Sequence, residues 1–293
     1  TILMIFLFGL FFSCKDSDSL SKETSDTNLE FTDYYNRKVK VKHNPETIIS
    51  LSPGITEILF DLGVGNKIIG RTIFCNFPKE ALQIEAIGGI TDASLERIIA
   101  LRPQIVITSS MVRKDFVKKK KKAGISIICL PERSNIEGVY NTINILGKIF
   151  DKENTADSLI NNMKNQLNEI KSTYNKESYK PSVYYVVGYG ATGDFTAGKN
   201  TYINEIIELS GGRNIANNVS NWSYSKEELF AQQPDYIIVR QEDLNDFINT
   251  TPYKDLEAVK KKKVLGINSS LMDCQTCRSV EAIRIISNFI HQK

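Results

Sequence analysis

Short apolar runs alternate with segments of helical periodicity along most of this chain of 293 residues. The apolar runs of the first half are TIISL (47–51), KIIGR (67–71), PQIVITS (103–109) and GISIICL (124–130). Buried parallel strands are short and almost wholly apolar, whereas surface helices repeat apolar residues every three or four positions. Helical patterns such as SPGITEILFDLGVG (52–65) stand between the runs. The alternation predicts a parallel α/β architecture for residues 37–150.

The same alternation returns in residues 179–293. The predicted strands there are PSVYYVVG (181–188), PDYIIV (234–239) and KVLGI (263–267), and the predicted helices include NTYINEIIELSGG (200–212) and SVEAIRIISNFI (279–290). Glycines close the first of these helices, as is usual at a helix C-terminus. The second half therefore predicts another α/β lobe.

One sequence pattern, a predicted helix followed by a predicted strand, occurs twice in the chain. SLERIIALRPQIVI (94–107) and SKEELFAQQPDYII (225–238) share Ser, Glu, Ala and Pro at the same places, followed by an apolar run. A second pair of similar helices, at 56–66 and 204–214, stands at a different offset. We infer two lobes that are built alike but carry different loop insertions.

Residues 151–178 separate the lobes and contain neither Gly nor Pro. Their apolar residues fall on one face of a helix: Leu159, Ile160, Met163, Leu167, Ile170 and Tyr174. One long helix is therefore expected to join the lobes, which permits tilting more readily than wide closure. The expected fold is two Rossmann-like α/β lobes with a ligand cleft between them, at the carboxyl ends of their strands.

The first residues predict a location of the protein outside the cytoplasm. ILMIFLFGLFF (2–12) is too short to cross a bilayer comfortably, ends in SC and is followed by a polar stretch. This pattern is typical of a lipoprotein signal peptide over 1–14, with Cys14 as the lipid-attachment residue and 15–36 as a flexible tether. A fragment of a transmembrane anchor is the alternative. Both place the body of the protein on the extracytoplasmic side of a membrane.

Composition and charge exclude several classes of protein. The chain is 41% hydrophobic and 24% charged, as in globular proteins, and its net charge of +3 is mild. The basic runs 118–122 and 260–263 contain no aromatic residue for stacking on bases, so no nucleic acid partner is expected. The chain has only two histidines, and no metal site is predicted. Cys75, Cys129, Cys274 and Cys277 remain after Cys14, and their pairing stays open.

Four stretches carry a resemblance to a known family. They are IISLSPGITEILFDLGVG (48–65), the first repeated unit, FTAGKNTYINEIIELSGGRNIA (195–216), and Trp222 shortly before the second repeated unit. Over about residues 45–290 the chain resembles the substrate-binding proteins of ABC importers for iron complexes and corrinoids. Among these it is most similar to the cobalamin binders. The resemblance implies a non-catalytic monomer that captures a corrinoid, cobalamin or cobinamide, and needs no cofactor.

The resemblance also implies a protein partner. Members of the family dock on the permease dimer of the importer, which works with an ATPase, through one exposed glutamate on each lobe. By position these are Glu96 and Glu227, one in each repeated unit. A second interpretation is that each carboxylate only favours the dipole of the helix that it begins. Both roles are compatible.

The ligand contacts implied by the resemblance lie in loops of both lobes. Phe74 is the expected partner of the corrin ring, because aromatic faces suit a flat macrocycle. The other implied contacts are Arg71 and Cys75 beside it, Tyr189 and Phe195 in a glycine-rich turn, Trp222, and Met272, Asp273 and Gln275 in the last loop. The sequence departs from the cobalamin binders where GGITDAS (88–94) and LMDCQTC (271–277) replace a second tryptophan and a charged pair.

Other ligands and another class of protein stay open at this point. A ferric siderophore would use Arg71, Arg240 and Tyr189, and haem would need a tyrosine or histidine on its iron. The CQTC motif (274–277) before a helix is also compatible with a thiol oxidoreductase. Any enzyme would require a nucleophile, a base or a metal cluster, and the sequence shows no such constellation.

Overall fold

Four parallel strands form the sheet of the N-terminal lobe. The computed structural model describes residues 28–122, 125–131, 134–174, 179–220 and 222–292. The strands are β3 (Ile48–Ser50), β4 (Ile68–Arg71), β5 (Ile105–Thr108) and β6 (Ile127–Cys129), and their spatial order is β4-β3-β5-β6. The helices α1 (Pro53–Asp61), α2 (Leu95–Leu101) and α3 (Lys114–Lys122) connect them. Two 3₁₀ turns, Gly65–Lys67 and Lys79–Gln83, complete the connections.

The C-terminal lobe repeats this topology. Its parallel strands are β7 (Ser182–Tyr185), β9 (Arg213–Asn214), β11 (Tyr236–Arg240) and β12 (Val264–Ile267), in the order β9-β7-β11-β12. In both sheets the first strand along the chain therefore lies between the second and the third. The helices are α6 (Tyr202–Leu209), α7 (Lys226–Gln232), α8 (Leu244–Asn249), α9 (Glu257–Lys260), α10 (Ser269–Asp273) and α11 (Ser279–Ile290). A small ribbon of β8 (Asp194–Phe195) and β10 (Ser223–Tyr224) and the 3₁₀ turns Gln241–Asp243 and Tyr253–Asp255 are added to this lobe.

The strands are apolar on both faces because helices cover both sides of each sheet. In β3, Ile48 belongs to a core that runs through both lobes, whereas Ile49 belongs to a second core on the other face. Val183 and Tyr184 of β7 divide in the same way between the common core and a core of the C-terminal lobe. Alternate side chains of a strand point to opposite faces, so a doubly covered strand has no polar face.

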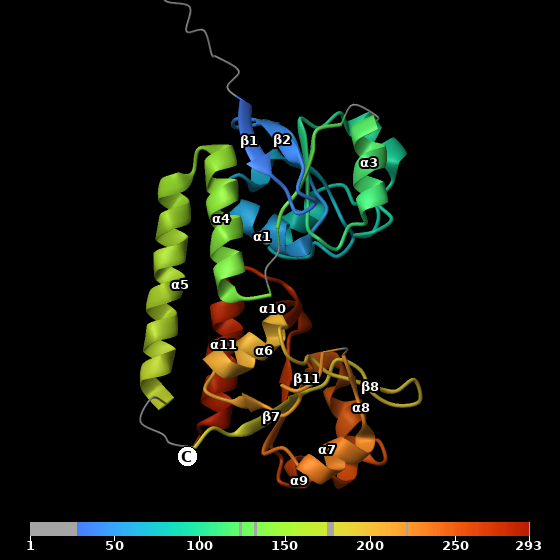
Figure 1. The fold of residues 1–293 in the computed structure, drawn as a ribbon, viewed down its shortest axis with the longest axis vertical. Helices are drawn as coiled ribbons and strands as arrows, with labels where there is room; N and C mark the ends of the chain where they lie inside the picture. Colours follow the sequence, from blue (N-terminus) through green and yellow to red (C-terminus); the bar gives the residue numbers. More distant parts are fainter. Residues whose placement is uncertain (1–27, 123–124, 132–133, 175–178, 221, 293) are drawn as a thin grey trace, which may run out of the picture.

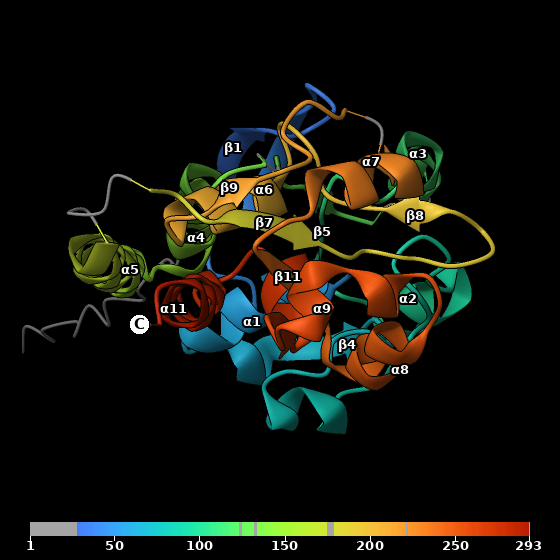
Figure 2. The same cartoon turned by 90° about the horizontal axis from the view of Figure 1, so that it is seen from below.

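Two long helices follow the N-terminal sheet and lead to the C-terminal lobe. α4 (Ile136–Phe150) and α5 (Glu153–Tyr174) lie side by side, and α5 passes from the N-terminal to the C-terminal lobe (Figure 1). Seen from below, α11 lies between α5 and the strands of the C-terminal lobe (Figure 2). The buried residues of α5 are Ala156, Ile160, Met163, Leu167 and Ile170, at the spacing of one helix face. The fold expected from the sequence, two α/β lobes joined by one long helix, is confirmed.

The predicted tether reaches too far into the chain. β1 (Asn28–Thr32) pairs antiparallel with β2 (Lys38–Lys42), and Tyr34 N–H donates to the Cys129 carbonyl at 2.8 Å. The hairpin forms because Phe31 and Val39 are cross-strand partners that pack on the core of the lobe. Residues 28–36 therefore belong to the N-terminal lobe, whereas 1–27, with Cys14, lie outside the described residues. Within the described ranges no helix is long and apolar enough to span a membrane.

Candidate ligand-binding site

A cavity of about 870 Å³ opens between the two lobes. It lies beyond the carboxyl ends of the parallel strands, where loops and helix starts from both lobes meet. The N-terminal lobe lines it with Ser52, Pro53, Gly54, Ile55, Phe74, Asn76, Ile90, Met111 and Leu130. Ser134 comes from the loop before α4, and Thr142 lies within α4. The C-terminal lobe lines it with Val187, Lys199, Asn200, Thr201, Tyr202, Ile203, Ser220, Trp222, Ser269, Ser270, Met272, Asp273, Cys274 and Gln275.

Two exposed aromatic side chains line the cavity from opposite lobes. Phe74 is 54% exposed and Trp222 is 44% exposed. Trp222 has a left-handed backbone, with φ of 65°, which is unfavourable for a bulky residue. Its carbonyl is held by the Thr196 amide at 2.8 Å. An indole that is kept half exposed on a strained backbone fits a surface that is completed by a ligand.

The last loop brings three of the predicted contacts to the cavity, namely Met272, Asp273 and Gln275. Met272 is 1% exposed, so its main role is packing. Asp273 pairs with Arg240 at 3.3 Å. Burial raises the pKa of the Asp273 carboxyl, although the guanidinium of Arg240 acts in the opposite direction.

Arg71 and Cys75 are not placed at the cavity, contrary to the expectation from the sequence. Arg71 is 7% exposed, and its guanidinium donates to the carbonyls of Ala81 at 2.7 Å and Thr72 at 2.9 Å. Cys75 is fully buried, with its sulfur 3.1 Å from the hydroxyl oxygens of Thr56 and Thr72. Both side chains hold the loop that presents Phe74, and their predicted contact with ligand is not supported.

Tyr189 and Phe195 also lie away from the cavity lining. The Tyr189 hydroxyl donates to Asp246, and its ring packs edge-on against Phe247 with the centroids 5.1 Å apart. Phe195 belongs to the β8–β10 ribbon and lies over Gly188. Gly188 and Gly193 of this turn thus lie against the Phe195 ring.

Several lining residues were not identified from the sequence. Met111 is 61% exposed in the loop after β5, and Lys199, Asn200 and Tyr202 come from the start of α6. The only sequence signal for them is position, because each follows or precedes an element at the carboxyl edge of a sheet.

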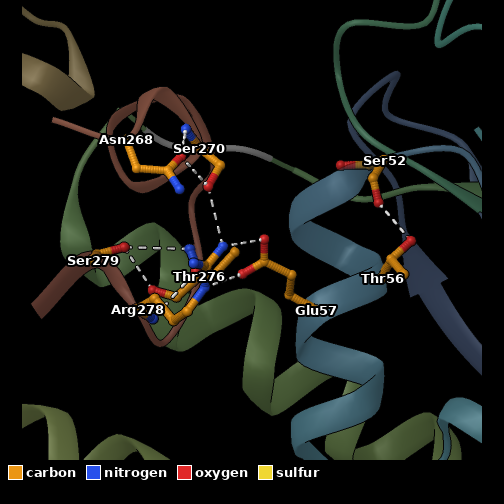
Figure 3. A network of polar contacts seen from close by, with 8 residues as sticks. All are labelled: Ser52, Thr56, Glu57, Asn268, Ser270, Thr276, Arg278 and Ser279. Atoms are coloured by element: carbon orange, nitrogen blue, oxygen red, sulfur yellow. Dashed lines mark hydrogen bonds and ion pairs between the residues drawn. The ribbon is translucent and has the colours of Figure 1, made fainter. Parts of the chain in front are cut away.

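A buried ion pair ties α1 of the N-terminal lobe to the loop before α11, next to the cavity (Figure 3). Arg278 donates to both carboxylate oxygens of Glu57, at 2.9 and 2.7 Å. The guanidinium of Arg278 also stacks on the ring of Phe77, 3.7 Å from its centroid. Glu57 and Arg278 lie 221 residues apart, so no local pattern indicates this contact.

Comparison with known proteins identifies the family of the chain. A family model described as a periplasmic binding protein matches residues 48–271. The chain belongs to this family.

Relatives of this periplasmic binding protein agree with the assignment. An uncharacterized ABC transporter substrate-binding lipoprotein of Bacillus subtilis is 27% identical over 283 residues, which cover 94% of this chain and 89% of the relative. The vitamin B12-binding protein of Vibrio parahaemolyticus is 27% identical over 243 residues, covering 81% of this chain and 86% of the relative. The solved haem-binding protein RhuT of Roseiflexus has a TM-score of 0.77 at 21% identity, covering 84% of this chain and 98% of that one, which shows the fold alone.

The two repeated units of this periplasmic binding protein adopt the same local structure. α2 and α7 each have seven residues. Ser94 accepts from the Arg97 amide at 3.3 Å, and Ser225 accepts from the Glu228 amide at 3.0 Å. Glu96 and Glu227 are exposed in the first turn of these helices, and neither lines the cavity. Their place is compatible with docking and with the dipole role, and docking stays a prediction.

The cysteines of this periplasmic binding protein do not form a reactive pair. No disulfide joins the four cysteines of the described ranges. Burial raises the pKa of the Cys274 thiol to about 12 and also raises that of Cys277, whose neighbour Asp61 disfavours a thiolate. Catalytic CxxC motifs have lowered thiol pKa values. The CQTC motif therefore lacks the electrostatics of a thiol oxidoreductase. Among the residues with described positions, no group of three or more His, Cys, Asp or Glu is arranged to hold a metal ion.

Proposed function

We propose that this periplasmic binding protein captures a corrinoid, cobalamin or cobinamide, and delivers it to the permease dimer and ATPase of an ABC importer. The observation that carries the proposal is the cavity between the lobes, with Phe74 and Trp222 exposed in it from opposite sides. Its volume of about 870 Å³ is large among small-molecule sites, which are roughly 300–1,000 Å³. Aromatic faces bury a flat macrocycle at low cost in side-chain entropy.

The charged groups favour a corrinoid over a ferric siderophore or haem. Polyanionic siderophores need several free cations, but Arg71 is saturated by backbone carbonyls and Arg240 pairs with Asp273, which leaves Lys199 as the cation of the described lining without an ion pair. Histidine and tyrosine are two of the side chains that hold haem iron. Among the described lining residues Tyr202 is the only one of either kind, and its hydroxyl donates to Ser279. Burial raises the pKa of the Cys274 thiol to about 12, which disfavours a thiolate ligand. Relatives named as vitamin B12-binding proteins support the same ligand.

The ligand is identified by the chromophore that the protein retains. Separate samples are incubated with cyanocobalamin, haemin and a ferric siderophore, desalted, and scanned for visible absorbance. We expect retention of the corrin spectrum at one ligand per protein. Saturable retention of haem or siderophore without any corrinoid would replace the proposed ligand by the one retained.

Trp222→Ala should weaken corrinoid binding by about 1–3 kcal/mol, because the indole would no longer cover the ligand. Phe195→Ala is the matched control, since Phe195 is also a partly exposed aromatic of this lobe but lies outside the cavity lining. Isothermal titration of both folded variants gives the two dissociation constants. Equal affinities would remove Trp222 from the binding surface.

We propose further that the protein is held on the extracytoplasmic face of a membrane by lipid on Cys14. The apolar run 2–12 followed by Ser-Cys supports this proposal, as does a relative named as a lipoprotein. Cys14→Ser should release the protein from membranes in cell fractionation. A variant that stays in the membrane fraction and uncleaved would show that the anchor is a helix.

A further inference from the structure

Helix starts from both lobes line the cavity. α1 contributes Ser52, Pro53, Gly54 and Ile55, and α6 contributes Asn200 to Ile203. The helices have nine and eight residues. The first amides of a helix have no acceptor inside it, and the helix dipole adds partial positive charge at this end. Both helices therefore direct a weakly positive end at the ligand.

The N-termini of α1 and α6 differ in the hydrogen bonds that their first amides make. At α6 the Thr201 side chain accepts from the Asn204 amide at 3.2 Å. At α1 the residue in the same position is Ser52, and it makes no capping hydrogen bond. Because Pro53 has no N–H, the amides of Gly54 and Ile55 are the donors at this end that lack a side-chain cap.

The Ser52 hydroxyl supplies a second and independent observation. Ser52 is 6% exposed, and its hydroxyl has no hydrogen-bond partner among the described residues. Figure 3 shows it pointing away from Thr56, on the side of the loop that carries Asn268 and Ser270. The neighbouring hydroxyl of Thr56 instead donates to the Ser52 carbonyl at 3.0 Å. Ser52 lines the cavity, so its hydroxyl is accessible to a ligand group that enters there.

The charges around this end do not oppose an anion. Asp273 is the acid of the described lining and pairs with Arg240, and Glu57 of α1 pairs with Arg278. Glu205 of α6 is not part of the lining and accepts from the Ile136 amide. Lys199 lines the cavity from the C-terminal lobe and has no ion pair in the described structure. The lining thus offers a cation and uncapped amides without an unpaired carboxylate.

We propose that Ser52 and the amides of Gly54 and Ile55 form a subsite for an anionic oxygen group of the ligand, a phosphodiester or a carboxylate. The inference rests on the proposed binding function and deepens it. Cobalamin carries a phosphodiester in its nucleotide loop, whereas cobinamide lacks it. The subsite therefore makes cobalamin the preferred corrinoid.

The test compares two corrinoids on the full chain and two variants. Ser52→Ala removes the hydroxyl, and Ser220→Ala removes a cavity serine that is outside the helix starts. Because Ser52 Oγ has no partner in the protein, the variant should fold with an unchanged melting temperature. The wild type should bind cyanocobalamin roughly tenfold more tightly than dicyanocobinamide, since a hydrogen bond to a charged group is lost with the phosphate.

Ser52→Ala should reduce this preference several-fold by weakening cobalamin alone, whereas Ser220→Ala should keep it. Equal binding of both corrinoids by the wild type would overturn the subsite and leave the proposed function standing. An equal loss for both corrinoids in Ser52→Ala would also overturn it.

A second experiment is used if no corrinoid binds. That outcome would overturn the proposed ligand but not the subsite. Haem is then compared with its dimethyl ester, in which both carboxylates are blocked. Preference for the free acid, lost in Ser52→Ala, would support a carboxylate subsite, and equal binding would overturn it.

If neither the corrinoids nor haem bind, inorganic phosphate is titrated into ¹⁵N-labelled protein. Shifts of the Gly54 and Ile55 amide resonances that Ser52→Ala diminishes support the subsite, and unmoved resonances overturn it.

Discussion

Neighbouring residues in the loop after β4 differ strongly in their exposure to solvent. Phe74 is 54% exposed in the cavity, whereas Cys75, the next residue, is fully buried. Arg71 begins the same loop and is held by backbone carbonyls, including those of Ala81 and Thr72. A buried guanidinium keeps its charge, so its burial is costly unless hydrogen-bond acceptors surround it. The role of Arg71 is thus to shape the loop that carries Phe74.

Arg71→Ala should lower the free energy of unfolding by about 2–4 kcal/mol, because several buried carbonyls lose their donor. Urea unfolding followed by circular dichroism measures this loss. Arg102→Ala is the control, since Arg102 is an exposed arginine of the same lobe. Normal stability combined with lost ligand affinity would instead make Arg71 a ligand contact.

At the scale of elements, the repeated unit is the feature that both lobes share. α2 and α7 have the same length, serine caps at the same place, and left-handed residues at their ends, Arg102 with φ of 48° and Gln233 with φ of 43°. Local capping explains Ser94 and Ser225 fully. The helix dipole favours an acidic residue in either first turn, and docking on a two-fold symmetric partner is the predicted additional role of Glu96 and Glu227.

Changing Glu96 and Glu227 together should impair uptake by cells while leaving the ligand affinity of the purified protein unchanged. Each exposed ion pair contributes only about 0.2–1 kcal/mol, so the double alanine variant should show a clear defect where single variants show little. The double lysine variant should be worse, because a surface that pairs with two carboxylates would repel two ammonium groups. The measurement is uptake of labelled ligand beside titration of each variant.

The control for this prediction is Glu153→Lys. Glu153 is also exposed and also lies in the first turn of a helix, but that helix is the connecting α5. It should transport normally. Normal uptake by the double lysine variant would show that Glu96 and Glu227 serve their helices only.

At the scale of the whole molecule, contacts across the lobes restrict their relative movement. A common core runs through both sheets, α4 and α5. The ion pair of Glu57 and Arg278 adds a polar tie beside the cavity, with side chains 4% and 19% exposed. Solvent screening is weak at such burial, so loss of one partner leaves an uncompensated charge.

Glu57→Ala and Arg278→Ala should each lower the free energy of unfolding by about 3–5 kcal/mol, as expected for breaking a buried ion pair. The double variant should lose much less than the sum, because it leaves no unpaired charge. Urea unfolding of the four proteins gives the coupling energy. Additive losses would mean that the two side chains stabilise the protein independently.

The sequence by itself determined the alternation of apolar strands and helices in the two similar lobes, the connecting helix and the family, but not the β1–β2 hairpin. These features depend on local patterns, such as apolar runs, the serines that cap α2 and α7, and the apolar face of α5, which each segment carries wherever it packs. The resemblance to the family also implied that Phe74, Trp222 and the residues from Met272 to Gln275 lie at the cleft, and the structure has Phe74, Trp222, Met272, Asp273 and Gln275 in the cavity lining.

Only the tertiary structure decided which side chains within those loops face the cavity. Arg71, Cys75, Tyr189 and Phe195 have the chemistry of contacts but find partners inside the protein. The unpartnered hydroxyl of Ser52 and the pairing of Glu57 with Arg278 likewise have no signature in the sequence. The physical reason is that burial and hydrogen bonding are settled by groups far apart along the chain, once packing has brought them together.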